Sequence, residues 1–232
     1  MRLIRFIAAA MFVLLAGSAF AQEYTEYVNK VDRFTVNAPG QPTVQDITWP
    51  SEYGAVFPGR LYSWTAGANK YSMTVIDYTE AERIHSERKN HTEADSNNMY
   101  WRIDIQASIQ YAATKFRRRP GATVTFDAWH YIDLVSGHQL QLTNADLSRS
   151  FIGVYLHENR LYILEATVPP RAPQPGLFQQ SVGFLDEAGN HVRYREIYFN
   201  KTPEPKLQEG RGGRGGAGGG GGRGGRGGAP QQ

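Results

Sequence analysis

The chain of 232 residues contains no cysteine. Disulfide bonds therefore cannot stabilise the fold, thiol chemistry is excluded, and the lipid anchor of a lipoprotein has no residue to carry it. Long apolar runs are also scarce, because the one at residues 7–15 is too short to cross a bilayer and no second run follows it. We expect a fold held together by burial of apolar surface alone.

Catalytic and metal-binding motifs are missing as well. The sequence has no G-x-S-x-G nucleophile turn and no H-x-x-x-H or H-E-x-x-H spacing. Ser136, Gly137 and His138 are close together, but a glycine between polar residues is typical of a hairpin turn. The six histidines are His85, His91, His130, His138, His157 and His191. We expect all except His130 to lie at the surface, and we predict no catalytic residue, no metal site and no cofactor.

The N-terminus has the three parts of a secretory signal peptide. Arg2 and Arg5 form a positive start, the apolar run follows, and an Ala-Phe-Ala triplet ends at residue 21. We predict cleavage after residue 21, a mature chain that begins at Gln22, and a periplasmic or secreted location.

Charge separates the rest of the chain into a body, 22–205, and a tail, 206–232. The net charge of +3 misleads, because the signal and the tail hold the surplus of basic residues and the body is slightly acidic. The tail is rich in glycine and resembles RGG segments, with arginines at Arg211, Arg214, Arg223 and Arg226. Such a composition predicts disorder. Anionic envelope polymers or lipid headgroups are its expected partners, with an inert spacer as the alternative, and export argues against nucleic acid.

The body is predicted to form one α+β domain. We expect strands near 34–36 and 44–47, a hairpin of 61–65 with 71–78, and helices over 79–89 and 100–119. Further strands follow at 124–134 and 139–143, then a hairpin of 151–156 with 161–168, a short segment over 177–185 and a last strand over 192–199. The basic run at 115–119 is expected to complement the dipole at the end of the long helix, with phosphate binding as the alternative.

This order of elements resembles the PsbP/Mog1-like group of small domains. The similarity rests on residues 34–42 (FTVNAPGQP), residues 160–164 (RLYIL) and residues 178–184 (FQQSVGF). The resemblance implies an antiparallel sheet with helices packed on its faces. It implies no catalytic residue, because that group shares none.

The strand over 124–134 carries the candidate ligand-binding residues. Alternation places Asp127, Trp129, Tyr131 and Asp133 on one face and His130 on the other, otherwise apolar, face. Carboxylates among aromatic rings are suited to a sugar or a cationic ligand. The alternative is that a helix covers the rings while the acids reach water. We expect His130 to be a core residue that is hydrogen-bonded to a neighbour.

These observations predict an exported, non-enzymatic binding or accessory module of the bacterial envelope. Two alternatives stay open. One is an envelope-acting hydrolase whose catalytic side chains are distant in the sequence. The other is a protein that binds anions through its tail.

Overall fold

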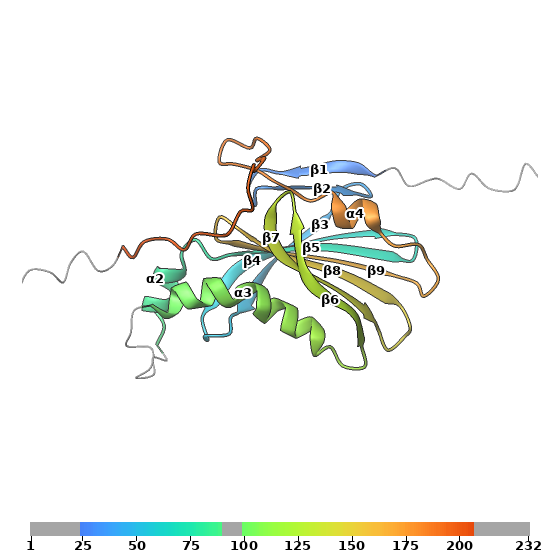
Figure 1. The fold of residues 1–232 in the computed structure, drawn as a ribbon, viewed down its shortest axis with the longest axis horizontal. Coiled ribbons are helices and arrows are strands. Elements are labelled where there is room, and N and C mark those ends of the chain that lie inside the picture. The colour runs from blue at the N-terminus through green and yellow to red at the C-terminus, as the bar shows by residue number, and fades with distance from the viewer. Residues whose placement is uncertain (1–23, 90–98, 207–232) are drawn as a thin grey trace, which may run out of the picture.

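The computed structural model describes residues 24–89 and 99–206, which form two antiparallel sheets (Figure 1). The small sheet has the order β1-β2-β10 and consists of β1 (Thr25–Asn29), β2 (Phe34–Ala38) and β10 (Gly183–Phe184). The predicted signal peptide and residues 207–232 of the predicted tail lie outside the described residues.

The large sheet has seven strands in the order β3-β4-β5-β9-β8-β7-β6. Its strands are β3 (Thr43–Pro50), β4 (Val56–Ala66), β5 (Asn69–Asp77), β6 (Thr123–Ile132), β7 (Val135–Thr143), β8 (Arg149–His157) and β9 (Arg160–Val168). The helices are α2 (Ala81–Ser86), α3 (Tyr100–Arg117) and α4 (Gly176–Gln180). The predicted antiparallel α+β fold is confirmed at this level, and so is the long helix that ends just before Pro120.

The large sheet lies between α3 on one side and β1 and β2 on the other (Figure 1). Each side has its own buried cluster. On the α3 side, Ile105 and Ala112 of the helix share a cluster with Leu140, Ile152 and Ile163 of the sheet. Because β8 is covered on both faces, its sequence is apolar almost without interruption, in place of the alternation of a half-exposed strand.

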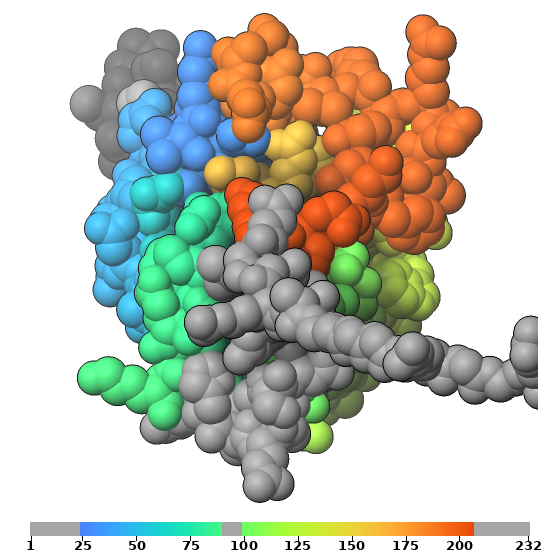
Figure 2. All heavy atoms as spheres, turned by 90° about the vertical axis from the view of Figure 1, so that its left-hand side faces the viewer, coloured from blue at the N-terminus to red at the C-terminus, as the bar shows by residue number. Residues whose placement is uncertain are grey.

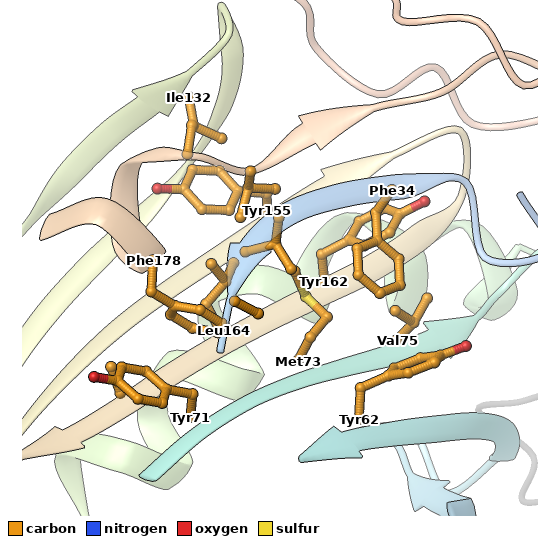
Figure 3. Packing of buried hydrophobic residues seen from close by; sticks show 14 of the residues in the cluster. Phe34, Tyr62, Tyr71, Met73, Val75, Ile132, Tyr155, Tyr162, Leu164 and Phe178 are labelled. Carbon is orange, nitrogen blue, oxygen red and sulfur yellow. The ribbon is translucent and has the colours of Figure 1, made fainter. Parts of the chain in front are cut away.

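Aromatic rings dominate the cluster on the other side. Figure 3 shows Phe34 of β2 above Tyr62 and Tyr162 of the large sheet, with Phe178 of α4 beside Tyr71. The Phe34 and Tyr62 rings meet edge to face with centroids 5.1 Å apart. Such pairs add to the free energy gained from burial alone, so ring packing helps to hold the small sheet on the large one.

The hairpin predicted over 151–168 is confirmed as β8 and β9. Glu158 and Asn159 form its two-residue turn, and both have positive φ angles, 46° and 58°. Two left-handed residues are what the tight turns of twisted hairpins require.

The turn between β6 and β7 was predicted at the wrong residues. Ser136, Gly137 and His138 belong to β7, whereas the turn is formed by Asp133 and Leu134, with φ angles of 49° and 63°. Gly137 serves packing instead. A β-carbon there would lie 2.2 Å from the ring of Tyr155, so glycine is needed for close approach and not for turning.

The last predicted strand, over 192–199, is absent from the described residues. Tyr198 of this segment forms an isolated bridge with Val135, and a second bridge, just before the segment, joins Leu185 and His191. Farther along, Arg102 of α3 donates hydrogen bonds to the hydroxyl of Thr202 (3.1 and 3.3 Å). Figure 2 shows this end of the chain, in red, between the green α2 region and the yellow-green β6–β7 hairpin. A few backbone hydrogen bonds and side-chain contacts therefore hold this end of the chain in place of a strand ladder.

The first helix is shorter than expected. It begins at Ala81 and ends at Ser86, and Thr79 lies before it. The hydroxyl of Thr79 donates to the carboxylate of Asp77 (2.6 Å), two residues earlier, which satisfies the hydroxyl locally.

Candidate binding surface

Four candidate residues, Asp127, Trp129, His130 and Tyr131, lie on β6, an edge strand of the large sheet. A bulge at Thr125 interrupts the pairing with β7, and from Phe126 to Ile132 the register is regular. Within this stretch Asp127 is opposite Leu140 and Trp129 is opposite His138. Opposite residues share a face, and Leu140 belongs to the cluster under α3. Asp127, Trp129 and Tyr131 therefore all lie on the α3 side, as the alternation predicted.

The two aromatic residues are the exposed apolar part of this face. Trp129 is 63% exposed and Tyr131 is 46% exposed. The alternative in which a helix covers the rings is wrong, but its second part holds, because Asp127 is exposed and Asp133 is partly exposed. We call Trp129 and Tyr131, with the side of β6 that carries them, the aromatic face.

Asp127 is held by its own chain. Arg117 of α3 donates to its carboxylate through Nε (2.6 Å) and Nη2 (3.0 Å), and His138 makes a further short contact through Nε2. Gln110 donates to the other nitrogen of the His138 ring (3.3 Å). The part of β6 that directly follows the bulge is therefore connected to α3 by a polar network.

Arginine has the largest effect on this carboxyl group. The hydrogen bond from Arg117, with a further contribution from His138, lowers the pKa of Asp127 to about 2. The charged form is thus stabilised, and its oxygens already have partners. Asp127 can position the edge of the aromatic face, whereas Trp129 and Tyr131 offer the accessible surface.

The remaining predicted residues of this strand are separated from the aromatic face. His130 lies on the opposite face, half-buried, with Nδ1 2.8 Å from the hydroxyl of Tyr155, as the expected contact with a neighbour requires. Burial lowers the pKa of His130. Asp133 is not on β6 but in the turn that follows it. Whether any of these residues binds a ligand stays a prediction.

The basic run at the end of α3 is used internally. Arg117 pairs with Asp127, Arg119 pairs with Glu165 (2.7 Å), and Lys115 lies over the rings of Trp49 (4.6 Å) and Tyr111. Three of the basic side chains that a phosphate would need already have partners within the chain, which argues against the phosphate-binding alternative. The tail arginines Arg211, Arg214, Arg223 and Arg226 lie outside the described residues.

A buried polar cluster was not foreseen from the sequence. One oxygen of the Asp104 carboxylate accepts the hydroxyl of Ser51 (2.5 Å) and lies 2.9 Å from Nε2 of His85. All three residues are buried. The carboxylate stands between serine and histidine, so the histidine does not contact the hydroxyl as a catalytic base would. The cluster connects α2, α3 and the segment after β3. In the sequence, the one indication of this cluster is that Asp104 lies among the apolar positions of the α3 helix.

The expectation of surface histidines is wrong at three positions. His85, His138 and His157 are buried, and His157 stacks on Phe184 with centroids 4.7 Å apart. Burial, with smaller effects from the charges of two nearby arginines, lowers the pKa of His157 to about 4. Each of the three contacts residues distant in sequence, which spacing alone cannot reveal.

The described residues contain no group of three or more His, Cys, Asp or Glu side chains placed to hold a metal ion. Within 24–89 and 99–206, no helix is both long and apolar enough to span a membrane.

The comparisons with known proteins find a likeness of structure, and none at the level of a family model or a curated sequence. The structure is similar to the solution structure of cyanobacterial PsbP (CyanoP) from Synechocystis sp. PCC 6803. The TM-score is 0.36 at 9% sequence identity, over 66% of this chain and 85% of that chain. This similarity concerns the fold alone, and no activity follows from it.

Proposed function

We propose that the protein is an exported, non-enzymatic binding or accessory module of the bacterial envelope, and that it binds through the aromatic face. The observation that carries this proposal is the exposure of Trp129 and Tyr131 side by side on an edge strand. Exposed aromatic rings are enriched at binding surfaces, because they supply much apolar area while fixing few torsions.

The envelope location rests on the N-terminal sequence. The positive start, the short apolar run and the Ala-Phe-Ala triplet before Gln22 together favour export and cleavage. The absence of cysteine favours a form without a lipid anchor, in the periplasm or outside the cell.

Two side-chain clusters bear on the choice between a binding module and a hydrolase. Both ring nitrogens of His138 have partners within the chain, and Asp104 separates Ser51 from His85. Neither arrangement presents a base next to a nucleophile. This favours the binding module over the hydrolase.

We also infer the finer fold assignment, a PsbP/Mog1-like sandwich in which helices pack on the faces of the sheet. The shared cluster of α3 and the large sheet supports it, as do the sequence similarities at residues 34–42 and 160–164. The fold assignment leaves the ligand open.

Co-sedimentation with isolated envelopes tests the proposed function. The mature chain from Gln22 is mixed with the envelope fraction of cells that produce it, and the bound fraction is measured. Replacing Trp129 and Tyr131 together by serine should lower binding at least fivefold. The control Val44→Ser changes an exposed apolar residue on the opposite edge strand and should leave binding unchanged. Undiminished binding of the double variant would contradict the proposal.

The tail provides a second candidate function, because four arginines follow the body in a glycine-rich segment. If it binds anionic polymers or headgroups, removal of residues 206–232 should release the protein in the same assay. Binding through the tail should also weaken steeply as salt is raised. Retention of the shortened chain at every salt concentration would reject this candidate.

A further inference from the structure

The outer edge of β6 has no strand beside it in the described part of the chain, since β7 is its one neighbour in the sheet. We propose that this edge pairs, antiparallel, with β6 of a second copy, which joins two seven-stranded sheets into one. This inference goes beyond the proposed function, because it names a partner for the outer edge of the strand that carries the aromatic face.

The pairing can be symmetric without leaving any regular residue unmatched. The stretch between the bulge at Thr125 and the turn at Asp133 runs from Phe126 to Ile132, and its midpoint is Trp129. A two-fold axis at Trp129 places Phe126 opposite Ile132 of the second copy. Opposite residues then share a face, as an antiparallel ladder requires, and a symmetric interface matches one patch with itself.

Charge favours a copy of the same strand over a charged partner. The single carboxylate between Phe126 and Ile132 is that of Asp127, and it is already paired with Arg117. The one histidine of this stretch, His130, has a lowered pKa and is therefore neutral near pH 7. Two such edges can meet without placing unpaired like charges opposite each other.

The apolar surface also supports this occupant. Phe126 is 43% exposed on one face of β6, and Trp129 and Tyr131 are exposed on the other. Long apolar edge strands invite pairing with another strand unless charge or proline prevents it. In the proposed dimer, the aromatic faces of the two copies adjoin on the α3 side and form one larger surface.

Sedimentation velocity of the purified mature protein tests the pairing, over a concentration series and without envelope material. Wild type should form a dimer. Trp129→Lys places two like charges opposite each other at the axis and should raise the dimer dissociation constant at least tenfold. Val44→Lys, the matched change on β3, should leave it unchanged, and circular dichroism verifies that both variants fold.

Charge reversal tests the register. Trp129→Glu alone should also be monomeric, whereas an equal mixture with Trp129→Lys should form a heterodimer, because the opposite charges then face each other. Phe126→Lys provides a second disruption on the other face if the Trp129 variants fail to fold. A monomeric wild type, a dimer that Val44→Lys disrupts and Trp129→Lys does not, or a mixture that stays monomeric would each overturn the inference.

Failure of this inference can be told from failure of the proposed function. A monomer that binds envelopes through Trp129 and Tyr131 rejects only the pairing. A dimer whose envelope binding is indifferent to both residues rejects only the proposed function.

Discussion

The two edge strands of the large sheet each carry a tryptophan on the α3 side, and the two tryptophans have different surroundings. Trp49 of β3 is half-buried, with the ring of Tyr111 against it (6.1 Å between centroids) and the ammonium of Lys115 over it. Trp129 of β6 is 63% exposed. Among the described residues its one ring contact is with His138, at 5.6 Å between centroids and with the two rings edge to face. One helix therefore covers one edge tryptophan and leaves the other open.

The cause lies in what α3 presents on its two flanks. Tyr111 and Lys115 lie toward β3, and Gln110 and Arg117 lie toward β6. An aromatic ring and an alkyl chain cover an indole, whereas a guanidinium paired with a carboxylate leaves the neighbouring ring free.

The edges also differ in what would stop another strand from pairing. On β3, the side chain of Asp46 is exposed with no hydrogen bond or ion pair to any described side chain, and the strand ends at Pro50. On β6, the carboxylate of Asp127 is neutralised by Arg117. Charge and proline protect edges, so β3 is protected, and β6 relies on the bulge at Thr125 alone.

The largest expected effect concerns the strands that support each edge. Gly137→Ala on β7, next to β6, places a β-carbon 2.2 Å from the Tyr155 ring and 2.4 Å from a backbone oxygen. Gly59→Ala on β4, next to β3, meets a backbone oxygen at 2.7 Å. We expect losses in the free energy of unfolding of about 3 kcal/mol and about 1.5 kcal/mol, respectively. Urea denaturation measures both, and equal losses would contradict the tighter packing behind β6.

The next effect concerns the ion pair. Asp127→Asn should lower the free energy of unfolding at pH 7 by about 1 kcal/mol, a value reduced for the partial exposure of the pair. The folded-state pKa of about 2 lies below the ordinary value of 3.8. The stabilisation is therefore fully present above about pH 4 and is lost as the pH falls toward 2. Wild type and variant should converge over that range in denaturation measured at each pH.

The matching change on β3 is the control. Asp46→Asn removes an exposed carboxylate without a described partner, so its difference from wild type should be small at every pH. A constant difference for Asp127→Asn between pH 5 and pH 2 would show that the carboxylate acts through packing and not through its charge.

A smaller effect tests why Trp49 is covered. Lys115→Ala removes the ammonium over the indole and should cost about 0.5 kcal/mol of unfolding free energy. It should also make Trp49 more accessible to acrylamide. Arg118→Ala, an exposed neighbour on the same turn, should change neither quantity. Equal effects of the two variants would assign the loss to helix charge in place of the ring contact.

The sequence could predict what depends on neighbours along the chain. Alternation correctly placed Asp127, Trp129 and Tyr131 on one face, and the hairpin of β8 and β9 followed from its apolar runs. The pairing of the Asp127 carboxylate depends on Arg117 of α3 and His138 of β7. Those side chains meet Asp127 only after the strand and the helix have packed.

The wrong predictions have the same origin. Gly137 was interpreted as a turn residue because glycine favours turns, but it is required by Tyr155, a residue of the neighbouring strand. Asp104 and His85 belong to separate helices, and their spacing of 19 residues matches no motif. Contacts between elements decide burial, and neither periodicity nor spacing encodes them directly.

The smallest expected change in stability comes from the exposed tryptophan itself. Trp129→Phe should alter the free energy of unfolding by less than about 0.5 kcal/mol, because the ring has few contacts to lose. Its effect on fluorescence should be large. Of the four tryptophans, Trp64 and Trp101 are buried and Trp49 is half-buried, so Trp129 should dominate quenching by acrylamide.

Acrylamide quenching measured over a series of protein concentrations distinguishes an exposed β6 edge from one that is paired with a second copy. In dilute protein, Trp129→Phe should lower the quenching slope more than Trp49→Phe does. If β6 pairs with a second copy, the wild-type slope should fall as the protein is concentrated, while that of Trp129→Lys should stay constant. A wild-type slope that does not change with concentration, in a sample that sedimentation shows to be dimeric, would place the dimer contact away from Trp129.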